Sequence, residues 1–191
     1  SHFVDIGAGE SKPCLHLAAS HHVASITGYE ISGELWVHSL RTLAQLLQTD
    51  HGHHFSHTFL AHANVAHAET LRHATHVFSF DEGFPYHTLE QMGKIYNNSP
   101  HLYAIIAYHH PEIYGITEQY DLVGTIPTNK TIGRQMRTRQ AYVMIRKITP
   151  AAPPRHTQFT LPTPTNLKYH PVNEVPEILY RKGRPTMYKS T

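Results

Sequence analysis

Apolar and polar residues follow one another along this chain in blocks that suit short strands and short helices. Five segments that contain apolar residues and have the length of strands are predicted as strands, at residues 3–6, 24–29, 55–61, 75–80 and 102–108. Helices are predicted between them, at residues 13–20, 32–49, 66–73 and 86–96. Strands that alternate with helices predict a doubly wound α/β fold, in which a mostly parallel sheet lies between two layers of helices.

The last two apolar segments, residues 120–126 and 141–145, follow one another without a helix between them. Polar residues separate them, so we expect an antiparallel hairpin that closes one edge of the sheet. Residues 50–54 are predicted as a polar loop. Residues 1–147 are therefore expected to form one three-layer domain, which is within the usual size for a single core.

The first predicted strand ends in a glycine loop, Gly7-Ala8-Gly9. Glycine suits this position because a residue without Cβ allows a tight turn and lets the backbone approach a ligand closely. The second strand ends in Glu30, 21 residues after Gly9. In a βαβ unit such a carboxylate returns to the same edge of the sheet and accepts hydrogen bonds from ribose hydroxyls. The pattern predicts a cofactor that contains adenosine. The alternative is an ordinary tight turn with a solvated strand end.

Three classes of nucleotide site compete for this loop. A phosphate-binding P-loop requires Gly-Lys-Ser/Thr, whereas Lys12 stands between Ser11 and Pro13. A dinucleotide fold requires a third glycine where Lys12 stands, and Glu10 would repel a pyrophosphate. S-adenosylmethionine fits better because it carries no phosphate and has a positive sulfur. In this interpretation Asp5 and Gly7 face its methionine part, and the Glu30 carboxylate binds its ribose.

The ends of the next two strands offer further candidate site residues. Asn64 follows the third strand, where an amide can bind the adenine amino group while Val65 packs on the ring; the alternative is a cap for the following helix. The fourth strand leads into Phe80-Asp81-Glu82-Gly83-Phe84-Pro85. Ligands of open α/β sheets bind beyond the carboxyl ends of the strands. We therefore expect Asp81, Glu82 and Phe84 beside the reacting methyl group. Two carboxylates flanked by aromatic rings suit a cationic acceptor such as a lysine ammonium; the alternative is a charged turn.

These motifs together resemble one family of enzymes. The combination of Val4-Asp5-Ile6-Gly7-Ala8-Gly9, Gly28-Tyr29-Glu30-Ile31, Asn64 and the segment 80–85 resembles the disruptor-of-telomeric-silencing family, the histone lysine methyltransferases without a SET domain. The phrase Ser79-Phe80-Asp81-Glu82 is similar to that of the short kinetoplastid-type members. The resemblance covers residues 3–147. Its glycine loop is common to class I methyltransferases, and only the segment 80–85 points to this family.

The resemblance implies a class I, Rossmann-like methyltransferase fold, with S-adenosylmethionine as the cofactor and S-adenosylhomocysteine as the product. It also implies a lysine of a nucleosomal core histone as the acceptor, and a nuclear location. The expected cofactor contacts are Asp5, Gly7, Ala8, Gly9, Lys12, Glu30, Ile31, Asn64, Val65 and Phe80, and the expected catalytic residues are Asp81, Glu82 and Phe84. The sequence departs from the family in two features. The N-terminal helices and cofactor lid of the family, which precede its first strand, are not present in this sequence, and we expect them upstream of Ser1. Asp81-Glu82 stands where better-known members have an Asn pair.

Two other functions stay open. One is a class I methyltransferase with an RNA or small-molecule acceptor, although no Asn/Asp-Pro-Pro-Tyr sequence follows the fourth strand, which counts against common adenine or glutamine modification. The other is a catalytically silent binding module that keeps the fold, an alternative that the missing lid favours.

The net charge of +2 is unevenly distributed. Residues 1–147 hold 10 Lys and Arg against 12 Asp and Glu, whereas residues 148–191 hold 6 against 2, together with 8 of the 13 prolines. This Pro-rich basic extension is expected to lie along a surface or to be mobile, not to form a second domain. The polar part of the predicted hairpin carries Lys130, Arg134, Arg137 and Arg139. These cations form either a solvated loop or a contact for the phosphates of nucleosomal DNA or RNA.

The remaining composition excludes several classes of protein. Cys14 is the single cysteine, so an internal disulfide framework is excluded and an intracellular protein is favoured. No apolar segment has the length of a membrane span, and we expect no membrane partner. The 19 histidines include His51, His53, His54 and His57, but no H-E-x-x-H or paired Cys-x-x-Cys spacing accompanies them. We therefore expect no metal site.

Overall fold

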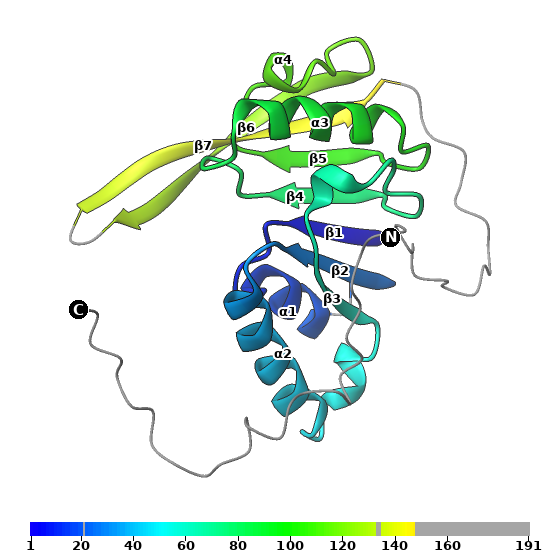
Figure 1. Cartoon of the computed structure of the whole chain (residues 1–191), viewed down its shortest axis with the longest axis vertical. Helices are drawn as coiled ribbons and strands as arrows, with labels where there is room; N and C mark the ends of the chain where they lie inside the picture. The colour runs from blue at the N-terminus through cyan, green and yellow to red at the C-terminus, as the bar shows by residue number, and fades with distance from the viewer. Residues whose placement is uncertain (21, 133–134, 148–191) are drawn as a thin grey trace.

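The computed structural model describes residues 1–20, 22–132 and 135–147. Its centre is a seven-stranded sheet in the order β3-β2-β1-β4-β5-β7-β6 (Figure 1). The first five strands are parallel, and β7 runs antiparallel to β5 and to β6. The bounds are β1 (His2–Ile6), β2 (Ser25–Glu30), β3 (Thr58–His62), β4 (His76–Ser79), β5 (Ala104–Ala107), β6 (Tyr120–Ile132) and β7 (Gln135–Arg146). The predicted parallel sheet with a closing hairpin is confirmed.

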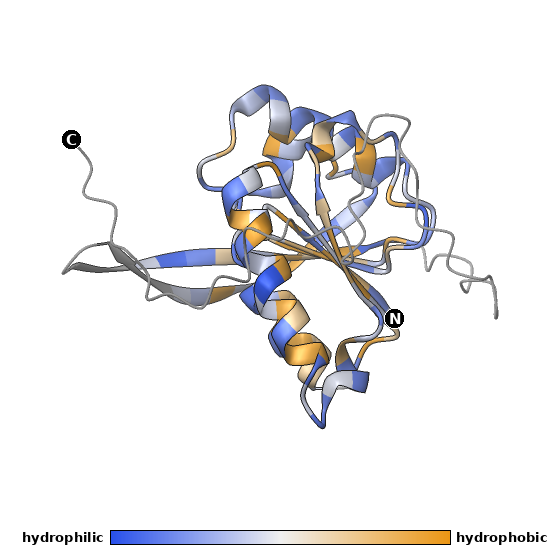
Figure 2. Ribbon diagram, turned by 60° about the horizontal axis from the view of Figure 1, so that its bottom comes forward, coloured by the Kyte–Doolittle hydropathy of each residue, from blue (hydrophilic) through white to orange (hydrophobic). Residues whose placement is uncertain are grey.

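Helices cover both faces of this sheet, which gives the fold its three layers (Figure 1). On one face, α1 (Lys12–Ala19) and α2 (Gly33–Leu47) pack around Ile26 and Phe55. On the other face, α3 (Tyr86–Asn97) and α4 (Pro111–Tyr114) pack around Ile105. Figure 2 shows that the sheet between them is hydrophobic and that the helices carry hydrophobic stretches among hydrophilic ones. Each layer therefore buries its apolar side against the sheet.

Local sequence explains α2 and its orientation. The Ser32 hydroxyl accepts a hydrogen bond from the Leu35 N–H at 3.4 Å and caps the start of the helix. Trp36, Leu40 and Leu43 recur at a spacing of three or four residues and are buried. This spacing places them on one side of the helix, which faces the sheet.

The contact between α3 and α4 depends on Gly93. A Cβ at this position would lie 1.7 Å from the Tyr114 carbonyl oxygen. Since no side chain fits there, glycine is required for the two helices to approach one another so closely.

The structure differs from the predicted elements in three segments of the first 114 residues. Residues 50–54 are not only a loop, because the 3-10 helix η1 (Gly52–Phe55) buries the Phe55 ring in the core, and β3 therefore starts only at Thr58. The predicted helix 66–73 shortens to the 3-10 helix η2 (Val65–His67). The apolar residues that follow, including Leu71 and Ala74, are buried without helical structure. The short helix α4 was not predicted, because a single turn leaves no periodic pattern in the sequence.

The hairpin strands are longer than predicted. Ala107, the last residue of β5, pairs with Tyr142 of β7. The residues of β7 before Tyr142 pair only with β6, from Ile126↔Ala141 to Ile132↔Gln135. This part of the hairpin, which we call the ribbon (residues 126–132 and 135–141), extends beyond the carboxyl end of β5 (Figure 1). The two strands satisfy one another's backbone groups, so polar residues continue them past the edge of the core.

All the described elements fall within residues 1–147. The predicted C-terminal extension, residues 148–191, and Arg134 lie outside the described residues. In the part of the chain that the structure describes, no helix is both long and apolar enough to cross a membrane.

Candidate functional site

The carboxyl ends of the parallel strands bring the predicted motifs to one edge of the sheet. Ile6 of β1 pairs with Tyr29 of β2 and with Ser79 of β4, and Glu30 pairs with His62 of β3. The glycine loop, Glu30 and the loops after β3 and β4 therefore leave the sheet at the same edge. The strand order reverses between β1 and β4. Such a switch point is the usual ligand site of an open α/β sheet.

The glycine loop turns sharply after β1. Gly7 has φ +74° and Gly9 has φ +57°, a region that L side chains enter only with strain. The N–H groups of Gly7 and Ala8 both donate to the Tyr29 carbonyl oxygen, at 2.9 and 3.0 Å. The loop is thus a tight turn that is held against the end of β2.

The Glu30 carboxylate faces this loop. Its Oε2 accepts the Gly9 N–H at 2.7 Å, and its Oε1 accepts the Ser32 N–H at 2.7 Å. An ionised carboxylate offers about four acceptor sites, so these two bonds leave capacity for the hydroxyls of a ribose. Next to it the Ile31 side chain is 65% exposed, an apolar surface beside the acid. The loop and the acid therefore lie together as the sequence predicts.

Asp5 lies buried beneath the loop. The Cys14 thiol donates to Asp5 Oδ2 at 3.5 Å. Burial raises the pKa of Asp5 to about 7; the nearby Glu30 carboxylate adds to the rise, and the bond from Cys14 opposes it. The same burial and the Asp5 charge raise the pKa of the Cys14 thiol, so the thiol stays protonated. Asp5 can therefore change its charge near neutral pH in response to a ligand.

Three further residues predicted to contact the cofactor, Asn64, Val65 and Lys12, have other partners in the structure. Asn64 Oδ1 accepts the Ala66 N–H at 3.0 Å and caps η2, which is the alternative considered for this residue. Val65 is buried in the core. The Lys12 side chain is 82% exposed and pairs with Glu10 at 2.6 Å. Among the described residues, no ion pair joins Lys12 to Asp5 or Glu30.

The surroundings of Asp81 differ from the exposed position that we expected. Its side chain is 0% exposed, with Oδ1 accepting the Tyr108 N–H at 3.0 Å and Oδ2 accepting the Tyr114 hydroxyl. Burial raises the pKa of Asp81, while these hydrogen bonds and His109 counteract the rise. The carboxylate thus anchors the loop after β4 to the end of β5 and to α4.

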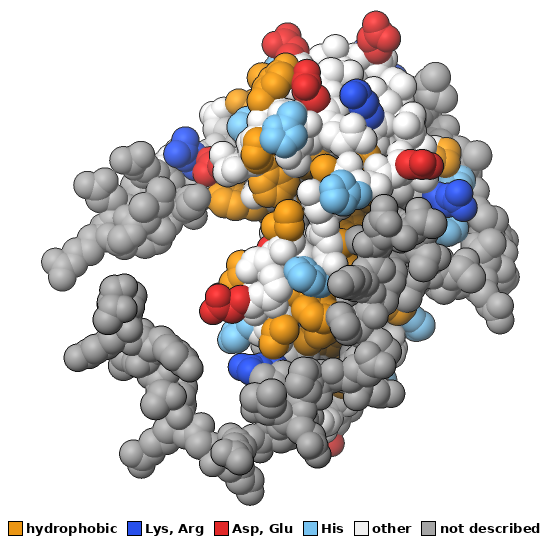
Figure 3. All heavy atoms as spheres, in the orientation of Figure 1, with side chains coloured by type: hydrophobic (Ala, Val, Ile, Leu, Met, Phe, Trp, Pro, Cys, Tyr) orange, Lys and Arg blue, Asp and Glu red, His pale blue; other side chains and the backbone are white. Residues whose placement is uncertain are grey.

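Glu82 and Phe84 do lie at the site edge. Glu82 Oε1 pairs with Arg139 Nε of the ribbon at 3.1 Å. A Cβ on Gly7 would lie 2.8 Å from Phe84 Cζ, so the Phe84 ring rests against the glycine loop. The loop after β4 therefore connects the ribbon to the predicted cofactor loop. On the face drawn in Figure 3, apolar side chains reach the surface beside the base of the ribbon, close to side chains of both charges.

Two tyrosines at this edge were missed from the sequence. Tyr108 follows β5, and its ring meets the Phe80 ring edge-on at 4.6 Å between centroids. Tyr142 packs edge-on against the His110 ring at 5.7 Å. The strand end at residue 108 was a signal for Tyr108, because side chains that follow a parallel strand reach the ligand edge. Tyr142 has no such local signal, since only the antiparallel register places it beside Ala107.

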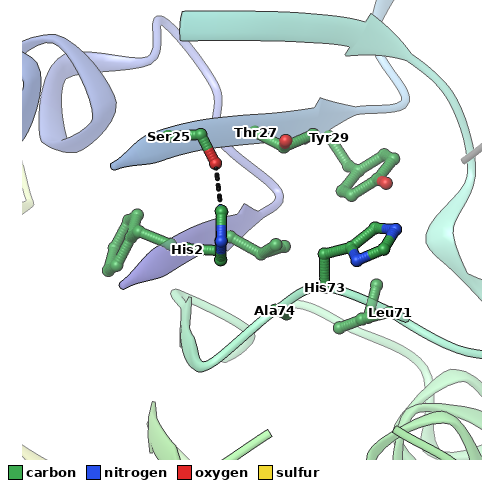
Figure 4. A pocket seen from close by; sticks show the side chains of 9 residues that line it. His2, Ser25, Thr27, Tyr29, Leu71, His73 and Ala74 are labelled. Carbon is green, nitrogen blue, oxygen red and sulfur yellow. Dashed lines mark hydrogen bonds between the residues drawn. The ribbon is translucent and has the colours of Figure 1, made fainter. Parts of the chain in front are cut away.

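A hollow lies against β1 and β2, beside the segment of residues 71–74. Its walls include His2, Ser25, Thr27, Tyr29 and His73 (Figure 4). His2 Nδ1 and the Ser25 hydroxyl are 2.7 Å apart. No carboxylate and no glycine loop line this hollow, so it is separate from the predicted site.

The histidines form no candidate metal site among the residues that the structure describes. Of the four basic hairpin residues, Arg139 is fully described, Lys130 and Arg137 are described by their backbone pairing alone, and Arg134 is outside the described residues.

Comparisons with known proteins bear on the fold. No protein-family model matches the chain, and no curated protein matches it. Among solved structures, Sp1610 of Streptococcus pneumoniae, a candidate tRNA (m1A22) methyltransferase, matches with TM-score 0.57 and 11% identity over 76% of this chain and 64% of that chain. TrmK of M. capricolum, solved with S-adenosylhomocysteine, matches with TM-score 0.57 and 9% identity over 81% and 66%. The methyltransferase domain of bacterial CtHen1-CN matches with TM-score 0.57 and 11% identity over 75% and 89%.

The chain spans less than two thirds of the length of the first two of these proteins. At such low identity the matches establish the fold and nothing finer. This chain has the Rossmann-like fold of class I methyltransferases.

Proposed function

We propose that this chain is a methyltransferase that uses S-adenosylmethionine. The observation that carries the proposal is the direct hydrogen bond between the glycine loop and Glu30 at the switch point of the sheet. This bond holds the Glu30 carboxylate next to a backbone turn that a ligand can approach closely, and the carboxylate can still accept hydrogen bonds from that ligand.

The residues at this edge fit such a cofactor. Glu30 is placed to bind the ribose hydroxyls, and the exposed Ile31 offers an apolar surface to the adenine ring. Asp5 lies under the loop and complements a positive charge above it. When bound, the cofactor supplies an electrophilic methyl group attached to a positive sulfur.

For the acceptor, we favour a lysine of a nucleosomal core histone. The segment 80–85 resembles the family that modifies such lysines, and the structure adds an aromatic cluster at the same edge. Phe80 and Tyr108 are in edge contact, and Phe84 lies on the glycine loop. Aromatic faces attract alkylammonium groups and exclude water from a transfer step. The amine must lose its proton before it attacks the methyl carbon. Because Asp81 is buried and bonded, we assign the loss of this proton to water.

An RNA acceptor is the second candidate. Sp1610 is described as a candidate tRNA methyltransferase, and its likeness to this chain covers 76% of the residues. The basic stretch of the hairpin also suits a phosphate backbone.

Calorimetry with S-adenosylmethionine tests the cofactor. We expect the whole chain to bind it, and we expect Glu30→Gln to weaken binding about 10- to 100-fold, since a charged hydrogen-bond partner is worth roughly 1.5–3 kcal/mol. The matched control is Glu34→Gln, an exposed carboxylate on α2 that contributes nothing to the loop. A wild-type chain without measurable binding would refute the proposal. An unchanged affinity in Glu30→Gln would remove Glu30 from the site.

Transfer of a labelled methyl group tests the acceptor. The protein is incubated with labelled cofactor and, in separate reactions, with nucleosomes, free histones and tRNA. Label on a histone lysine supports the favoured acceptor. Label in tRNA alone supports the second candidate and overturns the first. If the protein bound the cofactor but transferred no methyl group to any of these acceptors, the result would support the catalytically silent binding module.

A further inference from the structure

Arg139 occupies a specific place at the base of the ribbon. Its Nε lies 3.1 Å from Glu82 Oε1, and the two side chains are 42% and 18% exposed. Glu82 belongs to the loop that also carries Phe84, whose ring rests on Gly7. Arg139 is therefore connected to the candidate active site through a single loop, and its side chain is partly exposed to solvent.

The guanidinium can bind a second anion without releasing the first. It carries five N–H donors in a planar fork, and the contact with Glu82 uses the Nε side. Among the described residues, no other side chain forms an ion pair with Arg139. A guanidinium whose orientation is already set by a carboxylate loses less freedom when it binds a phosphate.

The register places two further basic residues at neighbouring positions of the ribbon. Arg139 pairs with Thr128, and Arg137 pairs with Lys130. Residues two apart along a strand share a face of the sheet. Positions 130, 137 and 139 therefore belong to one face of the ribbon, and Arg139 shows that this face meets the loop after β4 at the site edge.

We propose that Arg139 is a phosphate-binding residue that docks the DNA backbone of the nucleosome beside the acceptor site, while Glu82 holds its Nε edge in place. The choice of DNA rests on the proposed function, in which the acceptor is a histone lysine. The proposal gives Glu82 a positioning role through Arg139, in place of the catalytic role that its sequence position predicted. Guanidinium groups pair with phosphate oxygens through two parallel hydrogen bonds, which suits a site that must set orientation as well as attract charge.

The test measures binding of the full chain to a fluorescent DNA duplex at about 50 and 200 mM salt. Between these two concentrations, each phosphate contact that the protein makes lowers its affinity for DNA about 3-fold. The variants are Arg139→Gln and Arg139→Lys, with Arg72→Gln as the matched control because Arg72 is exposed at the amino end of β4, at the opposite edge of the sheet. At low salt we expect Arg139→Gln to bind the duplex about 10-fold more weakly than the wild type does. At high salt the ratio of the two affinities should be about 3-fold smaller, because the variant lacks one salt-sensitive contact. Arg139→Lys should fall between, because it keeps the charge and loses the fork.

Equal affinity of Arg139→Gln, Arg72→Gln and the wild type at both salt concentrations would overturn the proposal. Tighter, Arg139-dependent binding of tRNA than of the duplex would overturn the choice of DNA. Methyl transfer supplies a second readout: Arg139→Gln should raise KM for nucleosomes with little change in kcat, and should act like the wild type on free histone without DNA. If the wild type transferred no methyl group at all, the proposed function would fail, and the binding series would still decide the role of Arg139.

Discussion

Four carboxylates stand near one edge of the sheet, and their surroundings give them different tasks. Glu30 accepts two backbone N–H groups and keeps acceptor capacity. Asp5 is buried beside a thiol, Asp81 is buried between two tyrosines, and Glu82 pairs with an arginine. Burial raises the pKa of both Asp5 and Asp81, because desolvation favours the neutral form of a carboxyl group. At this scale, the role of each acid follows from its partners.

Asp5 predicts a pH dependence of cofactor binding. Burial raises its pKa from 3.8 to about 7, so much of it is neutral below pH 7 in the free protein. A cationic cofactor favours the ionised form, so its affinity should rise as the pH increases toward about 7 and level off above. Calorimetry between about pH 5.5 and 8.5 measures this. Asp5→Asn should abolish the dependence, and an identical pH profile in that variant would contradict the assignment.

The same shift has a consequence for folding. Because the folded protein holds the proton on Asp5 more tightly than the unfolded chain does, the free energy of unfolding should fall as the pH rises from about 4 to about 7. Above this range the contribution of Asp5 is constant.

At the scale of elements, the site depends on two loops that touch. The loop after β1 carries Gly7, and the loop after β4 lays the Phe84 ring where a Gly7 side chain would be. Asp81 fixes the start of the second loop to β5 and α4, and Glu82 ties it to the ribbon. The strands supply the rigid support, and these contacts decide where the loops rest.

Substitution of Gly7 tests this contact. Gly7→Ala combines a strained φ of +74° with a Cβ that would lie 2.8 Å from the Phe84 ring, so the ring must move. Gly115→Ala is the matched control, since Gly115 has φ +66° and open space around a Cβ. We expect the control to lose about 1 kcal/mol of unfolding free energy from strain, and Gly7→Ala to lose about 2–3 kcal/mol because overpacking is added. Denaturant unfolding measures both.

Equal losses in the two variants would show that the Phe84 contact contributes nothing. A further check is the double variant with Phe84→Ala, in which the excess cost of Gly7→Ala should disappear because the clashing ring is gone.

At the scale of the whole molecule, Arg146 joins the end of the hairpin to the rest of the domain. Its Nε donates to the Leu102 carbonyl oxygen at 2.7 Å, and its Nη2 donates to the carbonyl oxygens of Tyr96 and Ser99 at 3.0 and 2.8 Å. The guanidinium also lies 4.8 Å from the centre of the Tyr120 ring. One side chain thus connects β7 with the end of α3, the approach to β5 and the start of β6.

Replacement of Arg146 should destabilise the entire fold. Arg146→Lys keeps the charge but cannot reach these separate carbonyls at once, which leaves buried acceptors unpaired at a cost of about 1–3 kcal/mol. Arg41→Lys, at an exposed position of α2, should stay within about 0.5 kcal/mol of the wild type. Thermal unfolding compares them. A loss in Arg146→Lys no larger than in Arg41→Lys would mean that these bonds do not contribute to stability.

Much of the fold could be predicted because it depends on local patterns. The apolar runs that became β1, β2, β4 and β5, and the helical spacing in α2 and α3, are visible in any short window of the sequence. The predictions failed where contacts between residues far apart in the sequence determine the secondary structure. Phe55 was assigned to the third strand, but it lies in the 3-10 helix η1 and packs in the core from there. The hairpin continues past its apolar part because its two strands pair with one another.

The residues of the candidate site also fall into those that local sequence predicts and those that depend on distant contacts. By itself, the sequence determined the glycine loop and Glu30, because a missing Cβ and a fixed βαβ spacing carry their consequences within 30 residues of chain. Only the tertiary structure decided the roles of Asp81, Glu82 and Tyr142. Their partners Tyr114, Arg139 and His110 come from segments far along the chain, and burial and pairing, which set the charge and reach of a side chain, exist only once those segments have packed together.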